Sequence, residues 1–261
     1  MASSVVLGRA LDTLFPAHCA GCASGPWPFC PDCRAALVAL EPPWCERCGR
    51  PWWEPVDRCR DCPPPSIDGA RAPFLFAGPA RRAILRLKFS GWRAVADALG
   101  AAMLAVAAPP TVDAVTWVPL SRRRLAERGY DQAKALAAAT SRGLGVPMLP
   151  LLRRSIATAP QARRSADARR EAMRGAFDVS GRPPASVLLV DDVLTTGATA
   201  AECAEALRAS GARRVHVLTA ARALTGPVPR AYTRSGPRPG LWLPGEHLPG
   251  SRRQPRAKRP T

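Results

Sequence analysis

Residues 187–199 have the sequence V-L-L-V-D-D-V-L-T-T-G-A-T, and this stretch decides the fold. It begins with four apolar residues, a run typical of a strand that is buried on both faces of a parallel sheet. Two carboxylates, Asp191 and Asp192, follow at the point where we expect this strand to end. A turn rich in Thr and an alanine-rich helix over residues 200–209 come next. Strand, turn and helix in this order indicate one unit of an α/β domain.

The turn after this strand has the residue types that hold a phosphate group. Gly197 allows a tight turn and a close approach of the backbone. The first amides of the next helix lack partners within the helix and suit an anion. Thr195, Thr196 and Thr199 add hydroxyl donors. We expect this turn to bind the phosphate of a sugar phosphate and the two carboxylates to bind sugar hydroxyls; the alternative is an ordinary turn in which the acids are only a charge pair.

The segment resembles the phosphoribosyl-pyrophosphate (PRPP) loop of the type I phosphoribosyltransferases. In that family the paired acids bind the ribose 2′- and 3′-hydroxyls, the turn binds the 5′-phosphate, and Mg²⁺ accompanies PRPP. The resemblance implies that Asp191 and Asp192 are the catalytic acids. It further implies that PRPP is bound by the residues of the loop, which are Val193, Leu194, Thr195, Thr196, Gly197, Ala198 and Thr199.

One position departs from a branch of that family. Relatives that salvage purines place an aspartate two residues before the loop glycine, near the base. Thr195 occupies this position here. The departure argues against hypoxanthine or guanine as the acceptor, and nothing else in the sequence identifies the acceptor base.

Eight of the nine cysteines form four C-x-x-C pairs at the start of the chain. Two such pairs supply the four thiolates of one tetrahedral zinc site, so we expect two structural zinc ions. Disulfides are the alternative, and the expected cytoplasmic location argues against them. The spacing leaves open whether the pairs combine sequentially or in an interleaved way. The predicted ligands are Cys19, Cys22, Cys30, Cys33, Cys45, Cys48, Cys59 and Cys62.

The charge of +18 is distributed unevenly along the chain. Residues 1–65 carry 6 basic and 7 acidic side chains, a net −1, whereas residues 66–225 carry 24 and 12, a net +12. Residues 226–261 carry 8 and 1, a net +7, and are rich in Pro, Gly and Arg without periodicity. We expect a disordered basic tail there. The excess favours anionic partners, either nucleic acid or phosphorylated metabolites.

The chain divides into three predicted parts. Residues 1–65 hold a short amphipathic helix, expected over 1–15, and the cysteine pairs, and they end at Pro63-Pro64-Pro65. Residues 66–225 alternate strands and helices, which predicts a parallel sheet with helices on both faces and a ligand beyond the carboxyl ends of its strands. Residues 226–261 are the tail. No run of roughly eighteen apolar residues and no signal peptide is found, so we expect a cytoplasmic protein without a membrane span.

Three further segments resemble the signatures of the ComF family, in the same order. They are I-L-R-L-K-F-S-G (84–91), V-P-L-S-R-R-R-L-A-E-R-G-Y-D-Q-A (118–133) and residues 151–177. Members of this family carry a double zinc ribbon before a type I phosphoribosyltransferase domain and are associated with DNA uptake in natural competence. The resemblance implies that residues 153–174 are the flexible hood over PRPP. It also places more residues at the pyrophosphate pocket: Pro119, Leu120, Ser121, Arg122, Arg128, Tyr130 and Gln132.

Two functions remain open from the sequence. One is a ComF-like phosphoribosyltransferase that displaces pyrophosphate from PRPP with a nitrogen nucleophile and works with competence or DNA-processing proteins. The other is a PRPP or nucleotide sensor without turnover that binds single-stranded DNA. Its aromatic side chains at the cysteine pairs, such as Trp52 and Trp53, suit base stacking, although packing around the metal sites explains most of them.

Overall fold

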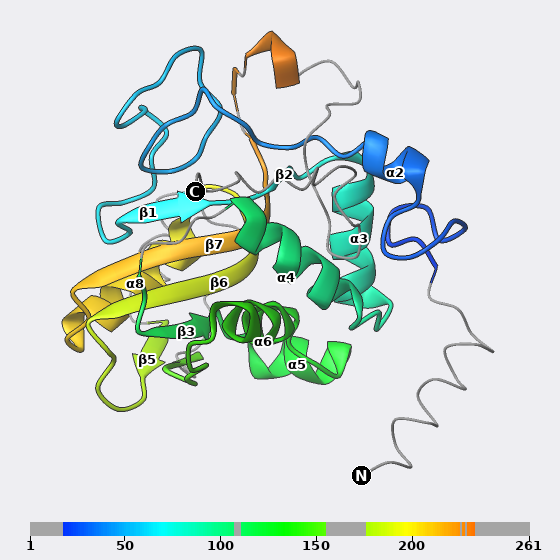
Figure 1. Ribbon diagram of the computed structural model, residues 1–261. Coiled ribbons are helices and arrows are strands. Elements are labelled where there is room, and N and C mark those ends of the chain that lie inside the picture. Colours follow the sequence, from blue (N-terminus) through cyan, green and yellow to red (C-terminus); the bar gives the residue numbers. More distant parts are fainter. Residues whose placement is uncertain (1–17, 107–110, 155–175, 225, 228, 233–261) are drawn as a thin grey trace, which may run out of the picture.

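A parallel sheet forms the centre of the molecule (Figure 1). The computed structural model describes residues 18–106, 111–154, 176–224, 226–227 and 229–232. Its strands are β1 (Gly69–Arg71), β2 (Phe74–Leu75), β3 (Ala114–Trp117), β6 (Ser186–Leu194) and β7 (Arg214–Arg222). The strand order is β1-β7-β6-β3, and β2 also pairs with β7 beyond the end of β1. All these pairings are parallel.

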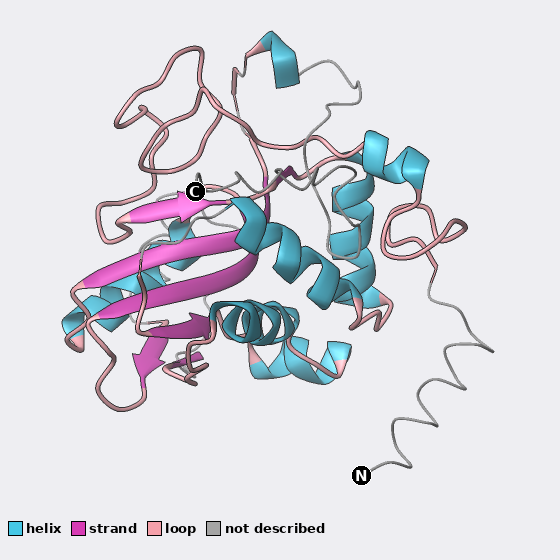
Figure 2. Cartoon of the chain, viewed as in Figure 1, coloured by secondary structure: helices cyan, strands magenta, loops and turns pink. Residues whose placement is uncertain are grey.

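Helices cover both faces of the sheet (Figure 2). On one face lie α3 (Gly78–Phe89), α4 (Val95–Val106) and α6 (Gln132–Leu144), and on the other lies α8 (Ala198–Ala209). Successive residues of β6 alternate between the two cores: Leu188 packs with the first group and Leu189 with α8. Burial of the strand on both faces explains its unbroken apolar run. The predicted fold class, a parallel α/β sheet with helices on both faces, is confirmed.

The central strand is longer than the sequence predicts. We expected it to end at the acid pair, but β6 continues to Leu194. Asp191 pairs with Thr219, and Leu194 pairs with Arg222. The expectation was wrong because β7 is long enough to supply hydrogen-bond partners beyond the doubly buried residues. Both acids therefore stand on strand backbone rather than on a loop.

The smaller elements lie around this sheet. Among the described residues, two further α-helices are α2 (Pro31–Ala35) beside the first cysteine group and α5 (Arg122–Arg128) before α6. The strand β4 (Leu152–Arg154) pairs antiparallel with β5 (Phe177–Val179). A 3₁₀ turn, η1, spans Arg230–Tyr232. Tyr232 is buried with Leu40 and Ala72, and its hydroxyl donates to the carbonyl of Glu41. The tail predicted from residue 226 therefore packs on the body at its start.

Some sequence predictions fall outside the described residues. These are the helix expected over 1–15, most of the hood expected over 153–174, and most of the tail. Within the described ranges, no helix combines the length and the apolar character needed to cross a bilayer.

Candidate functional site

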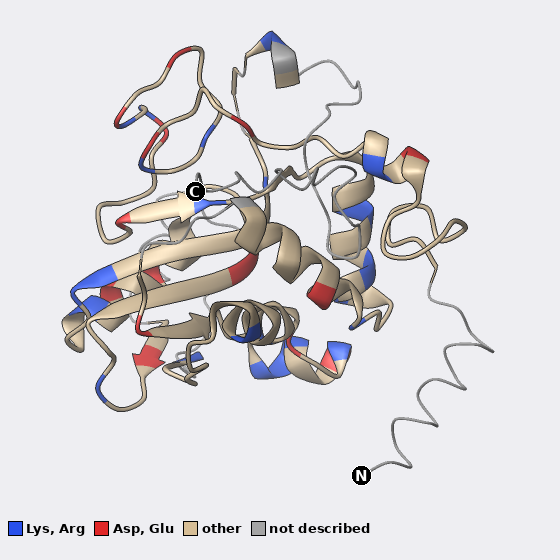
Figure 3. Ribbon diagram, viewed as in Figure 1, with Lys and Arg blue, Asp and Glu red and all other residues tan. Residues whose placement is uncertain are grey.

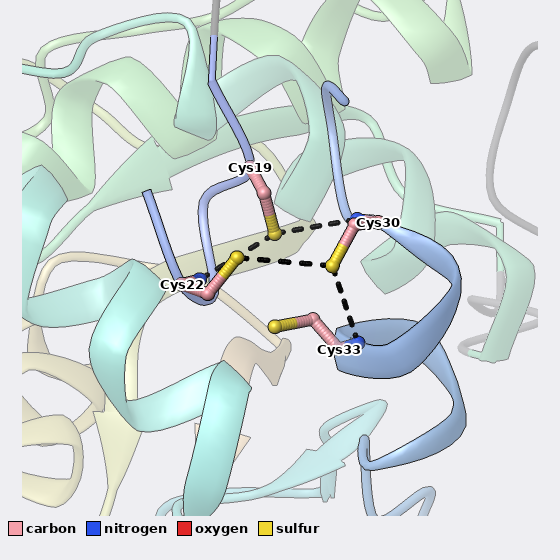
Figure 4. A group of neighbouring side chains, drawn as sticks. All are labelled: Cys19, Cys22, Cys30 and Cys33. Atoms are coloured by element: carbon pink, nitrogen blue, oxygen red, sulfur yellow. Dashed lines mark hydrogen bonds between the residues drawn. The ribbon is translucent and has the colours of Figure 1, made fainter. Parts of the chain in front are cut away.

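The eight paired cysteines gather into two groups of four (Figure 4 shows the first). Within each group all four Sγ atoms lie within 4.8 Å of one another. The first group contains Cys19, Cys22, Cys30 and Cys33, and the second contains Cys45, Cys48, Cys59 and Cys62. The structure thus decides the open question of pairing in favour of the sequential arrangement. None of the nine cysteines forms a disulfide, so the structure does not support the disulfide alternative.

The spacing of the sulfurs fits zinc. A tetrahedral ion with Zn–S bonds of about 2.3 Å places its sulfurs about 3.8 Å apart. The Sγ atoms of Cys22 and Cys30 are 3.7 Å apart, and those of Cys59 and Cys62 are 3.8 Å apart. Backbone N–H groups also point at the sulfurs, as from Cys30 to Cys19 at 3.2 Å. Such donors stabilise thiolates: those of Ser24 and Gly25 lower the pKa of Cys22 to about 6.

Arginine side chains of the α/β domain form hydrogen bonds with the backbone of both cysteine groups. Arg82 and Arg86 of α3 donate to the carbonyls of Gly21 and Ala20 in the first group. At the second group, Arg222 at the end of β7 is 3% exposed and donates to the carbonyl of Cys48 at 2.6 Å. The first cysteine group therefore contacts α3, and the second contacts the end of β7, the strand that pairs with β6.

The acid pair lies at the carboxyl end of β6 and makes specific contacts with two helices. Lys88, in the last turn of α3, places its Nζ 2.7 Å from Oδ1 of Asp192. Gln132, the first residue of α6, donates from Nε2 to Oδ2 of the same carboxylate at 3.0 Å. Oδ1 of Asp191 accepts the backbone N–H of Asp192 at 2.8 Å. The two acids are thus held in different ways.

The environment of Asp191 disfavours its charge. Burial and, next, the neighbouring carboxylate of Asp192 raise its pKa well above the usual value for aspartate. The ammonium of Lys88 opposes this rise, whereas Asp131 adds to it. A cation that arrives with a ligand would favour the ionised pair in the same way as Lys88.

The turn after β6 contains Gly197, the residue that the sequence marks as allowing a tight turn. Gly197 has φ +79°, in the left-handed region, and directly precedes α8. The N-cap residue Gly197 has no side chain to cap α8, and the N–H of Ala198 donates to the hydroxyl of Thr196 at 3.4 Å. The N–H groups in the first turn of a helix lack partners within the helix and suit an anion. Thr195 and Thr196 are exposed beside them. A side-chain Cβ at Gly197 would lie 2.8 Å from Cβ of Pro63, the residue after the last cysteine of the second group.

The other predicted residues lie on the loop after β3 and on the helices that follow it. Because β3 pairs in parallel with β6, with Trp117 opposite Val190, this loop starts beside the acid pair. The N–H of Leu120 donates to Oδ2 of Asp131 at 3.2 Å, and Ser121 caps α5. Pro119 is half-buried in this loop. Arg122 and Arg128 are the first and last residues of α5, none of whose residues is buried.

Tyr130 and the basic side chains near it lie next to this loop. Its ring lies under the guanidinium of Arg93, 4.9 Å away, and its buried hydroxyl has no partner among the described residues. Arg128 covers the ring of Phe89, which is 69% exposed, at 4.9 Å. Figure 3 shows basic residues recurring along α3 and α5.

Sequence reasoning missed Lys88. It lies within the segment I-L-R-L-K-F-S-G, but its basic helix gave no sign of a partner in a distant strand. The resemblance linked Gln132 to the pyrophosphate pocket, whereas its amide donates to Asp192. The signals present were its place in this signature segment and the basic side chains around it, Arg81, Arg82 and Arg86.

Comparisons with known proteins agree with this picture. The double zinc ribbon domain family matches residues 10–63, so the two structural zinc sites are confirmed. The DNA utilization protein YhgH of Escherichia coli K12 is 34% identical over 217 residues, which cover 77% of this chain and 93% of the relative. Competence protein F of Haemophilus influenzae is 30% identical over 75% of this chain and 90% of its own.

One solved structure also matches part of the chain. It is that of the allosteric regulatory enzyme of purine biosynthesis, with a TM-score of 0.37 and 22% sequence identity. The match covers 49% of this chain and 26% of that one.

Proposed function

Because this chain belongs to the ComF-like family, we propose that its α/β domain binds PRPP with Mg²⁺ in the service of DNA uptake or of DNA and nucleotide metabolism. The names of its relatives, a DNA utilization protein and a competence protein, support the second half of this proposal. The first half depends on the acid pair and the turn.

One observation carries the proposal: a single strand–turn–helix unit presents both halves of a sugar-phosphate site. Asp191 and Asp192 offer carboxylate oxygens to the ribose hydroxyls at the carboxyl end of β6. The first turn of α8, which follows the left-handed Gly197, offers backbone amides to the 5′-phosphate. Residues 195–199 would surround that phosphate.

The chemistry expected at this site needs positioning and charge rather than a covalent nucleophile. Departure of pyrophosphate from ribose C1 develops positive charge on the sugar, which the carboxylates stabilise. Oxygen donors suit Mg²⁺, and Asp191 offers them beside the turn, so the donor set fits an ion that neutralises pyrophosphate. The loop after β3, with Pro119, Leu120, Ser121 and Arg122, would line the pyrophosphate side.

Calorimetric titration of PRPP with Mg²⁺ tests the binding directly. Wild type should bind, and a variant with Asp191→Asn and Asp192→Asn should lose most of the affinity because the shape is kept and the charge is removed. Equal affinity in the two proteins would falsify the assignment. Release of pyrophosphate with a panel of bases then separates a transferase from a sensor that binds without turnover.

A second function, binding of single-stranded DNA, is favoured by exposed aromatic side chains, one of which lies beside a cation. Trp53 is 54% exposed and contacts Trp52 edge-on, and Phe89 is exposed under Arg128. Affinity should fall with salt by roughly 0.7 log units per phosphate contact for each tenfold increase. Deleting residues 233–261 should flatten this slope, whereas Trp53→Ala should weaken binding and leave the slope unchanged. An affinity for single-stranded DNA that does not change with salt concentration would contradict this function.

A further inference from the structure

The carboxylate of Asp192 is held at both oxygens by side chains from different helices. Nζ of Lys88, from the end of α3, lies 2.7 Å from Oδ1. Nε2 of Gln132, from the start of α6, lies 3.0 Å from Oδ2. The exposed fractions of the Asp192 and Lys88 side chains are 8% and 19%. Two hydrogen bonds hold this buried carboxylate in one orientation, and the ammonium of Lys88 balances its charge. A buried aspartate without these partners would have neither a fixed orientation nor a balancing cation.

The two acids of the pair are therefore not equivalent. Asp191 binds the backbone N–H of its neighbour with one oxygen and has no comparable cation at contact distance among the described ion pairs. We propose that Lys88 and Gln132 are positioning residues that fix Asp192 as the permanently oriented acid for recognition of the sugar hydroxyls. This inference rests on the proposed PRPP function and adds two residues to it.

The contacts of Lys88 and Gln132 with Asp192, called the clamp below, leave hydrogen-bond acceptors for a ligand. A carboxylate offers about four lone-pair directions, and Lys88 and Gln132 take two of them. In addition, Oε1 of Gln132 is a buried acceptor with no partner among the described residues, and its side chain is 3% exposed. A buried acceptor of this kind is costly unless a donor reaches it. A sugar hydroxyl is such a donor, so Gln132 can hold Asp192 and receive a hydrogen bond from the same ligand.

The inference makes a prediction about selectivity that a purely structural role does not. If Lys88 acts through Asp192, its loss should weaken recognition of the hydroxyls and spare the phosphate groups. The probes are ribose 5-phosphate, 2-deoxyribose 5-phosphate, which lacks one hydroxyl, and inorganic pyrophosphate. Lys88→Met should bind ribose 5-phosphate about ten- to a hundredfold more weakly than wild type does. The preference of wild type for ribose over deoxyribose should shrink, and pyrophosphate binding should stay the same.

Three variants complete the design. Lys88→Arg keeps the cation and should restore most of the affinity. Lys134→Met removes the same charge from a lysine that lies over the ring of Trp117 instead, and should bind as wild type does. Gln132→Met should reproduce the loss of sugar selectivity in case Lys88→Met does not fold. The inference would be overturned if Lys88→Met lost as much affinity for pyrophosphate as for ribose 5-phosphate. It would also be overturned if the variant kept the wild-type preference for ribose 5-phosphate over 2-deoxyribose 5-phosphate.

A measurement without ligand separates this inference from the proposed function. Thermal unfolding of Lys88→Met, Asp192→Asn and the double variant should show strong coupling, with the double variant losing less than the sum of the single losses. Additive losses would refute the clamp even if PRPP binds. If coupling is found but wild type binds neither PRPP nor ribose 5-phosphate, the proposed function fails, and with it the role of the clamp in sugar recognition.

Discussion

Replacing Gly197 by alanine tests how tightly the turn before α8 is packed. Gly197 is buried and has φ +79°, and a Cβ there would lie 2.8 Å from Cβ of Pro63. Pro63 cannot move freely. It follows Cys62, a ligand of the second zinc site, and its carbonyl accepts a hydrogen bond of 2.9 Å from Arg47. The new methyl group therefore meets a neighbour that is fixed at both ends.

Two costs add up in this variant. A left-handed conformation costs an L-residue roughly 1–2 kcal/mol. Overpacking against a fixed neighbour adds about 1–3 kcal/mol. Gly145 supplies a matched control, because it has φ +68° and a Cβ there would meet nothing within 4 Å. Gly145→Ala should show the first cost alone.

Thermal unfolding and PRPP titration measure the difference. Each kcal/mol lowers the midpoint by about 2–4 °C for a domain of this size, so Gly197→Ala should unfold several degrees below Gly145→Ala. It should also bind PRPP more weakly, whereas the control should bind as wild type does. Equal midpoints in the two variants would show that Pro63 yields, and the argument that the second zinc site supports the turn would be wrong.

The remaining predictions concern the metal sites, the acid pair and the aromatic side chains. Metal analysis should find two zinc ions per chain, and Cys45→Ser should lose one of them and open the second ribbon, because the metal supplies its folding energy; metal-free protein with the native fold would contradict this. Asp191→Asn should raise the unfolding midpoint of the ligand-free protein at neutral pH and leave it unchanged at low pH. The reason is that a raised pKa makes the folded state lose stability as pH rises through it; a lower midpoint at neutral pH would refute the assigned environment. Phe89→Ala should weaken single-stranded DNA binding by about 1–3 kcal/mol without changing the salt slope, as a fluorescence anisotropy titration at several salt concentrations would measure; a flattened slope would mean that the loss is ionic.

The metal sites show what the spacing of cysteines in the sequence predicts and what it does not. Four C-x-x-C pairs predict tetrahedral sites because two residues between cysteines allow both thiolates to face one ion. The same spacing cannot say which pairs combine, since that depends on the path of the chain between them. The helix α2 begins directly after Cys30 and returns Cys33 to the first group, which leaves Cys45 and Cys48 for the second.

The sequence by itself determined the strand, turn and helix around residues 187–199, the glycine that allows that turn, and the number of metal sites. These follow from contacts between near neighbours in the chain: an apolar run, a residue without Cβ, and paired thiolates. Tertiary structure alone decided that β6 extends through the acids, that Pro63 packs on Gly197, and that Lys88 and Gln132 hold Asp192. Each of these joins segments far apart in the sequence. The pairing of β6 with β7 extends the strand, and the packing of α3 and α6 on one face of the sheet brings Lys88 and Gln132 to Asp192. No local pattern in the sequence records these contacts.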